Sequence, residues 1–130
     1  MDAVGSVILY VADLDASIAF YRDVIGFTLK FSEHGYAEFL TEGTKLGLYE
    51  RSMLSGLIGR EASGGGSGGE VLFEVEDVDA WAERLSAQAV PILSGPTDRP
   101  WGQRTLHVED PDGFVVELAQ EIPRSRPRGR

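Results

Sequence analysis

The side chains of this 130-residue chain that could do chemistry are its carboxylates and two histidines, because the sequence contains no cysteine. Without cysteine there is no disulfide, no thiolate zinc site and no cysteine nucleophile. Among the acidic residues, Glu117 is distinctive because apolar residues flank it in a predicted strand. A carboxyl group in apolar surroundings has a raised pKa, which suits a general base. The same group can also accept hydrogen bonds or pair with a cation.

The two histidines, His34 and His107, stand in different sequence contexts. His107 falls in a segment of alternating pattern, so it either faces a ligand cavity or is a buried structural histidine. His34 precedes Gly35 in a tight connection, and we expect it at the surface. The glycine run GGGSGG is not followed by Lys-Ser or Lys-Thr, so it lacks the signature of a phosphate-binding loop.

The charge of the chain is strongly acidic. The net charge is −9, but four of the 12 basic residues are arginines of the tail at 123–130, so the rest carries −13. Such a body repels nucleic acid and favours either solubility alone or cationic ligands. The tail has too little apolar surface to fold by itself, and we expect it to be disordered. No signal peptide or membrane span is recognisable, which favours a cytoplasmic protein without membrane contact.

A short motif occurs twice, 64 residues apart: VADLDA at 11–16 and VEDVDA at 75–80. Each copy closes a predicted strand and opens an amphipathic helix. The acidic residues of both copies are placed to cap a helix N-terminus, and Gly26 is a plausible end for the first helix. The apolar stripes of the two helices have the same spacing and comprise Leu14, Ile18, Tyr21 and Ile25 in one copy and Val78, Ala82, Leu85 and Ala89 in the other.

Three strand-like segments follow each helix, so both halves of the chain read βαβββ. They are 27–32, 36–40 and 45–50 in the first half, and 91–93, 104–108 and 114–119 in the second. The sequence Asp-Pro-Asp-Gly at 110–113 predicts a type I turn that makes the last two strands a hairpin. We therefore expect one domain at 1–122, with module one at 4–50, a flexible glycine-rich linker at 51–69 and module two at 70–122. A sheet with one helix leaves its other face bare, so the two sheets should meet around a shared cavity.

The segments VADLDASIAFYRDVIGF (11–27) and PWGQRTLHVEDPDGFVVEL (100–118) resemble the vicinal oxygen chelate superfamily, which includes glyoxalases, bleomycin-resistance proteins and extradiol dioxygenases. The resemblance covers nearly the whole chain. It implies an α+β fold in which two tandem βαβββ modules form a cup-shaped mixed sheet, with a homodimer completing or lining the cup. Enzymes of this superfamily hold one divalent metal through four side chains, one from the first and one from the last strand of each module.

Residue by residue, the resemblance places those four positions at Ser6, Leu48, Glu70 and Glu117, with Glu50 as the alternative to Leu48. Leucine donates nothing to a metal, and a neutral serine hydroxyl is a poor ligand. Two carboxylates and water could still hold magnesium or manganese weakly. We therefore expect no catalytic metal and no other cofactor.

Strand alternation and the resemblance together predict the lining of the cup. The predicted ligand-binding residues are Ser6, Ile8, Tyr10, Phe39, Leu46, Leu48, Glu50, Glu70, Leu72, Trp101, His107 and Glu117. Phe39 and Trp101 are candidates for a stacking wall, although Trp101 fits a loop aromatic that caps the core equally well. An apolar lining with carboxylates suits a flat ligand that is cationic or rich in hydroxyls and amines.

The first hypothesis is therefore a non-catalytic protein that binds and sequesters an antibiotic-like small molecule, as the resemblance to the bleomycin-resistance type implies. The alternative is an enzyme of the same fold, a lyase, isomerase or dioxygenase, that is metal-dependent or uses Glu70 or Glu117 as general base. A third hypothesis is an accessory domain whose cup is vestigial.

Overall fold

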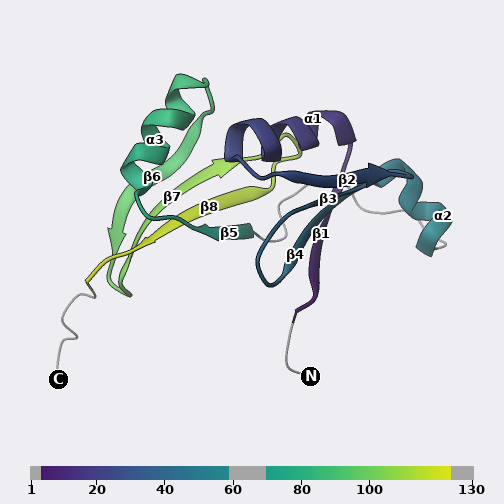
Figure 1. The fold of residues 1–130 in the computed structure, drawn as a ribbon. Coiled ribbons are helices and arrows are strands. Elements are labelled where there is room, and N and C mark those ends of the chain that lie inside the picture. The colour runs from purple at the N-terminus through teal and green to yellow at the C-terminus, as the bar shows by residue number, and fades with distance from the viewer. Residues whose placement is uncertain (1–3, 59–69, 124–130) are drawn as a thin grey trace. The chain divides into compact units, whose positions relative to one another are not determined.

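The computed structural model describes residues 4–58 and 70–123, which belong to two units, Met1–Gly64 and Gly65–Arg130 (Figure 1). Each unit contains one four-stranded mixed sheet, and the predicted order βαβββ is confirmed in both. Most of the predicted linker, residues 59–69, and the predicted tail from residue 124 lie outside the described residues. Within the two described ranges, no helix has the length and apolar character needed to span a bilayer.

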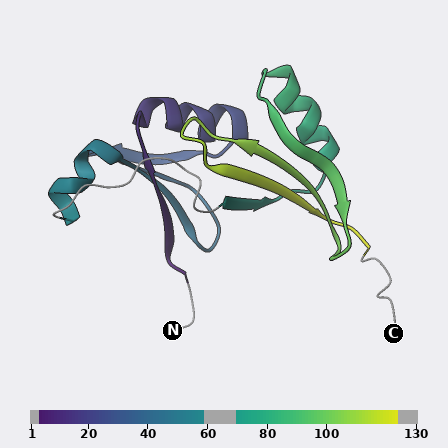
Figure 2. The same cartoon turned by 180° about the vertical axis from the view of Figure 1, so that it is seen from behind.

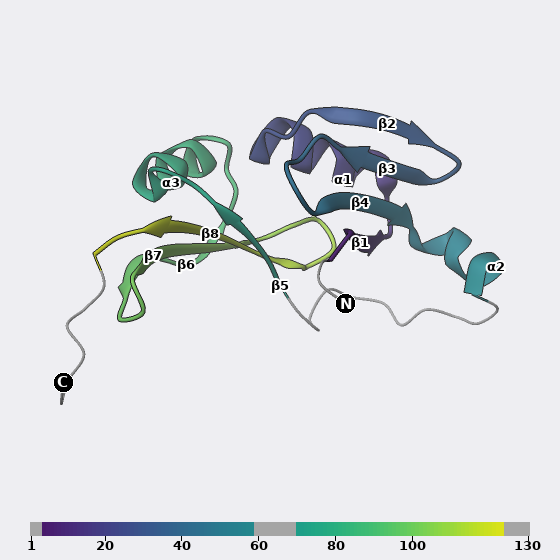
Figure 3. The same ribbon diagram turned by 60° about the horizontal axis from the view of Figure 1, so that its bottom comes forward.

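The first unit builds its sheet in the order β1-β4-β3-β2, which Figure 3 shows strand by strand. Strands β1 and β4 are parallel, and the other two pairs are antiparallel. Its elements are β1 (Ser6–Val11), α1 (Leu14–Ala19), the π-helical η1 (Phe20–Ile25), β2 (Leu29–Glu33), β3 (Tyr36–Phe39), β4 (Lys45–Glu50), the 3-10 turn η2 (Arg51–Met53) and α2 (Leu54–Ile58). The start of the predicted flexible linker, residues 51–58, is thus helical, and buried Leu54 holds it in place.

The first helical segment begins and ends where the sequence predicts. The Asp13 side chain accepts a hydrogen bond from the Ala16 amide and so caps α1. After η1, Gly26 ends the segment with a φ of 104°, a left-handed conformation that glycine adopts without strain. The helix packs its apolar stripe on one face of the sheet, where the ring of Tyr21 lies 6.1 Å from that of Phe39.

The second unit repeats this arrangement with the sheet order β5-β8-β7-β6. Its elements are β5 (Glu70–Glu74), α3 (Val78–Ala87), β6 (Ile92–Arg99), β7 (Gln103–Glu109) and β8 (Val115–Glu121). Figures 1 and 2 show α3 on one side of this sheet from opposite directions. No described helix of the unit covers the other side, which is called the open face below.

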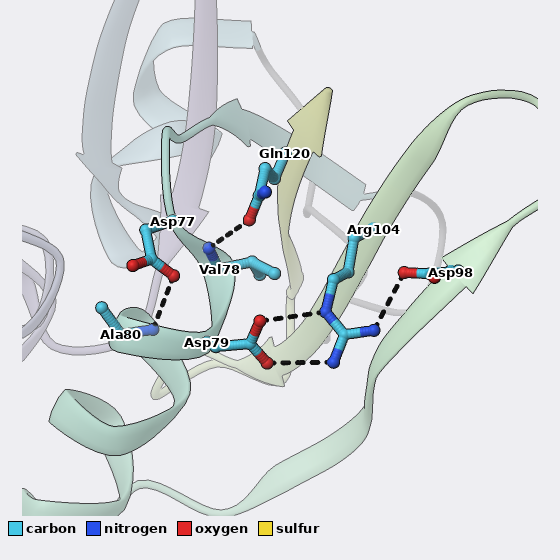
Figure 4. Close-up of polar contacts among 7 residues, drawn as sticks. All are labelled: Asp77, Val78, Asp79, Ala80, Asp98, Arg104 and Gln120. Carbon is cyan, nitrogen blue, oxygen red and sulfur yellow. Dashed lines mark hydrogen bonds and ion pairs between the residues drawn. The ribbon is translucent and has the colours of Figure 1, made fainter. Parts of the chain in front are cut away.

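Polar contacts fix the start of α3 on its sheet (Figure 4). Asp77 caps the helix by accepting a hydrogen bond from the Ala80 amide, as predicted, and the Val78 amide donates to the side chain of Gln120 in β8. Arg104 of β7 pairs with Asp79 of the helix at 3.0 Å and with Asp98 of β6 at 2.9 Å. These contacts tie the helix to three strands of the sheet.

The turn that joins β7 to β8 confirms the predicted Asp-Pro-Asp-Gly hairpin. The Gly113 amide donates to the Asp110 carbonyl at 3.0 Å, and Gly113 has a φ of 81°. The buried Asp110 carboxylate accepts hydrogen bonds from the amides of Asp112 and Phe114. Because this turn sets the register of β7 and β8, it also decides which of their side chains face each other.

Candidate functional site

Three ionisable side chains lie together on the open face of the second unit. Glu70 comes from β5, His107 from β7 and Glu117 from β8. The Nε2 atom of His107 lies 3.2 Å from Oε1 of Glu117 and 3.9 Å from Oε2 of Glu70. One possible ligand atom from each residue lies within 4.8 Å of the others. These three residues are called the Glu-His-Glu cluster below.

The strand register explains why the cluster forms. His107 is paired with Glu117 across the antiparallel β7 and β8, so their side chains stand on the same face. Leu72 is paired with Glu117 across the parallel β5 and β8. Glu70 precedes Leu72 by two residues and therefore shares its face. The predicted common face of Glu70, Leu72 and Glu117 is confirmed. His107, which was also predicted either to face the cavity or to be a buried structural histidine, lies on the same face.

Glu117 is the most buried member of the cluster, with 7% of its surface exposed. Burial raises the pKa of its carboxyl group, the neighbouring Glu70 raises it further, and His107 opposes the shift. The other ring nitrogen of His107, Nδ1, is buried and has no hydrogen-bond partner among residues 4–58 and 70–123. Two acidic groups and one imidazole therefore share a small, partly desolvated volume.

The first unit carries different side chains at the corresponding places. Both Ile8 of β1 and Glu38 of β3 are paired with Gly47 of β4, as Leu72 and His107 are paired with Glu117. Gly47 is thus the counterpart of Glu117, Glu38 of His107, and Ser6 of Glu70. A Cβ atom at Gly47 would lie 2.5 Å from the Tyr36 hydroxyl, so the Tyr36 ring occupies that space. No metal donor stands at this position in the first unit.

Part of the predicted lining is wrong in the first unit. Leu48 is paired with Leu9 and Ala37, all three are buried, and they lie on the face that packs against the helix. By alternation, Leu46 and Glu50 share that face rather than the face of Ser6. Phe39 is 1% exposed and packs against Tyr21 and Phe27 in the core, so it offers no stacking wall.

The remaining predicted contacts are accessible. Ile8 and Tyr10 are 45% and 40% exposed, and with Ser6 they lie on the face of β1 opposite to buried Leu9 and Val11. Trp101 is exposed in the turn between β6 and β7, where its ring N–H donates to the side chain of Gln103. Ser6, Ile8, Tyr10 and Trp101 stay predicted ligand contacts.

The sequence prediction missed a polar network in the first unit, on the face of the sheet opposite to buried Leu48. The Tyr36 hydroxyl donates to Glu38 at 2.9 Å, and Lys30 lies 3.5 Å from the same carboxylate. Burial and the acidic neighbour raise the pKa of Tyr36 to about 12. The alternation Tyr-Ala-Glu-Phe at 36–39 could have revealed both the network and the buried position of Phe39.

This network predicts a pH dependence of stability. The hydrogen bond from Tyr36, helped by Lys30 and opposed by burial, lowers the pKa of Glu38. A lowered carboxyl pKa stabilises the fold above the pKa of the unfolded chain, and this contribution is lost as the pH falls through the folded pKa. We expect Glu38→Gln to lose less thermal stability than the unchanged protein between about pH 6 and pH 3, measured by circular dichroism. Equal losses would contradict the assignment, and Asp15→Asn serves as an exposed control.

The four metal positions implied by the resemblance do not form a ligand set. Leu48 lies in the core, and its correctly aligned replacement, Gly47, has no side-chain donor. Glu70 and Glu117 remain, and His107 stands beside them from a strand that contributes no ligand in the inherited pattern. The carboxylate and imidazole groups that could bind a metal at these positions therefore all lie in the second unit.

Comparison with known proteins shows which family has this fold. The family model of the Glyoxalase/Bleomycin resistance protein/Dioxygenase superfamily matches residues 3–118. The bleomycin resistance protein of Geobacillus stearothermophilus is 30% identical over 125 residues, 88% of this chain and 93% of that protein.

Two solved structures are similar over almost the whole chain. A glyoxalase/bleomycin resistance protein/dioxygenase from Nocardioides has a TM-score of 0.81 at 26% identity, covering 100% of this chain and 90% of that one. Lactoylglutathione lyase from Agrobacterium tumefaciens has a TM-score of 0.77 at 30% identity, covering 92% and 94%. The chain therefore belongs to the Glyoxalase/Bleomycin resistance protein/Dioxygenase superfamily.

Proposed function

We propose that this protein binds a small molecule that carries a cationic, amine or hydroxyl group and sequesters it without chemical conversion. The observation that carries the proposal is the nearly buried Glu117 carboxylate beside Glu70 on the open face of the second unit. A desolvated carboxylate forms stronger charge-assisted hydrogen bonds than a solvated one. Leu72 and Val115, on the same face, supply apolar contact area for the rest of the ligand.

Two further facts support a binding role. Curated relatives of about 30% identity are named bleomycin resistance proteins, and this chain spans most of their length. The strongly acidic chain attracts cationic molecules and repels nucleic acid. A cationic or aromatic antibiotic is therefore the class of ligand that the proposal names.

The proposal is tested by thermal unfolding with a panel of bleomycin-type glycopeptides and flat polycyclic antibiotics. A ligand at a hundredfold excess over its Kd adds about 2.7 kcal/mol of stability. We expect a clear rise in melting temperature with at least one cationic compound, and recovery of the compound unchanged by mass spectrometry. No rise with any compound of the panel would overturn the proposal.

Glu117→Gln provides the matched variant, because it keeps the size of the side chain and removes the charge. We expect it to weaken binding of the active compound about tenfold or more, the usual loss for a hydrogen bond to a charged group. Glu121→Gln, in the exposed end of the same strand, is the control and should bind normally. Titration calorimetry measures both affinities, and equal weakening by the two variants would contradict a specific role for Glu117.

A second candidate function is proton transfer by an enzyme of this fold. It is favoured by the 3.2 Å separation of His107 and Glu117, the usual distance between an acid-base group and its partner. The similarity to a lactoylglutathione lyase at 30% identity is in keeping with it. In that case Glu117→Gln abolishes turnover, and the recovered small molecule is chemically altered.

A further inference from the structure

We infer that the Glu-His-Glu cluster binds one divalent transition-metal ion through Glu70, His107 and Glu117, entirely within the second unit. The four metal-ligand positions implied by the resemblance are spread over both halves of the chain, and Gly47 offers no side-chain donor at one of them. The proposed set keeps the two inherited carboxylates and takes its nitrogen ligand from His107 of β7, where the pattern has none.

The distances within the cluster fit a shared ion. Ligand atoms about 2.0–2.2 Å from a metal lie roughly 2.8–3.6 Å from their neighbours in tetrahedral or octahedral geometry. Nε2 of His107 is already 3.2 Å from the nearer Glu117 oxygen and 3.9 Å from that of Glu70. The Glu70 side chain is 47% exposed, so small rotations about its bonds can bring its carboxylate within coordination distance of an ion held by His107 and Glu117.

The strands hold the cluster in place before any ion binds. The three residues come from the neighbouring strands β5, β8 and β7, and the hydrogen-bonded ladders on both sides of β8 fix their spacing. Sites built on strands are held more precisely than sites built on loops. Little backbone freedom is therefore lost when the ion binds, and the main cost is the ordering of the Glu70 side chain.

The charge of the cluster favours a cation. Two carboxylates at short range repel each other, and Glu117 is largely removed from water, which is unfavourable unless a positive charge compensates it. One imidazole nitrogen with two carboxylate oxygens is a borderline donor set, better suited to zinc, manganese, iron or cobalt than to calcium. Three protein ligands leave at least one coordination position free for water or another molecule.

The inference is tested by titrating the purified full-length protein with cobalt chloride and zinc chloride in the absence of any antibiotic. We expect one ion per chain by calorimetry and a visible cobalt absorption spectrum. Quenching by bound cobalt of the fluorescence of Trp81 and Trp101, both of the second unit, gives an independent measurement. No binding at millimolar zinc or cobalt would overturn the inference.

The two histidines of the chain provide a matched pair of variants. His107→Asn removes the nitrogen ligand and should lower zinc affinity at least tenfold, whereas His34→Asn should not change it. His34 lies in the β2–β3 turn with a φ of 52°, a conformation that asparagine tolerates. Equal affinity of the two variants would contradict the inference.

Glu70→Gln covers the case in which His107→Asn fails to fold. Glu70 starts β5 and is exposed, so its replacement should preserve the fold while weakening zinc binding at least tenfold. Unchanged affinity in that variant would also contradict the inference. A cationic small molecule and the metal ion would compete for the same two carboxylates, so the titration contains no small-molecule ligand. Its failure and a failure of the antibiotic panel are therefore separate results.

Discussion

Leu48→Ala should lower the free energy of unfolding of the first unit by about 2–5 kcal/mol, the usual cost of replacing a fully buried leucine by alanine. Leu48 is 0% exposed and lies beside Leu9 and Ala37 on the helix-covered face of its sheet. The cost has two parts, the lost burial of the side chain and the cavity left in a core that relaxes only partly. Urea denaturation followed by far-ultraviolet circular dichroism measures it.

Ile8→Ala is the matched control for Leu48, because Ile8 lies on the opposite face of the same sheet and is 45% exposed. We expect it to cost less than about 1 kcal/mol. The tryptophans of the chain lie only in the second unit, so their fluorescence separates unfolding of that unit from unfolding of the first. If Ile8→Ala lowered the free energy of unfolding more than Leu48→Ala does, the assignment of Leu48 to the buried face and Ile8 to the exposed face of this sheet would be wrong.

Much of the fold could be predicted because the signals for it are local. The aspartate caps, the apolar helical stripes and the Asp-Pro-Asp-Gly turn are short-range patterns, and the structure contains all three. Only Ala89, the last residue of the second predicted stripe, is wrong, because it lies beyond the end of α3 with a φ of 58°. Strand β6 was predicted too short, at 91–93 instead of Ile92–Arg99, because Gly95 and Pro96 are typical strand breakers. The sheet accommodates them by a shift of register between Ser94 and Thr97, which no local pattern indicates.

In the candidate site, too, the positions that depend on the pairing of strands were harder to predict than the positions within one strand. Glu70 and Glu117 were assigned from the resemblance, Leu72 was placed on the face of Glu70 by alternation within β5, and the register agrees. Leu48 was also assigned from the resemblance, which did not fix the register of β4, and a shift of one residue moves every side chain of a strand to the other face. His107 joined the cluster only through its pairing with Glu117, a contact between residues ten apart that the hairpin turn determines.

Gly95→Ala should be among the most destabilising single substitutions in the second unit, with an expected cost of about 3 kcal/mol or more. Gly95 has a φ of 92°, which alanine adopts only with strain. An added Cβ would also overlap the carbonyl oxygen of Thr105 in β7, a backbone atom that cannot rotate away. Urea denaturation followed by tryptophan fluorescence reports directly on this unit.

Gly113→Ala separates the two causes, because Gly113 also has a positive φ, 81°, but has no atom within 4 Å of an added Cβ. It should cost only the conformational strain, about 1 kcal/mol. The difference between the two variants then measures the close approach of β6 to β7, and equal costs would show that strands β6 and β7 are not in tight contact there. Since Ser94 is paired with His107, separation of these strands should also displace the imidazole, so Gly95→Ala is expected to weaken zinc binding although it alters none of the three proposed ligands.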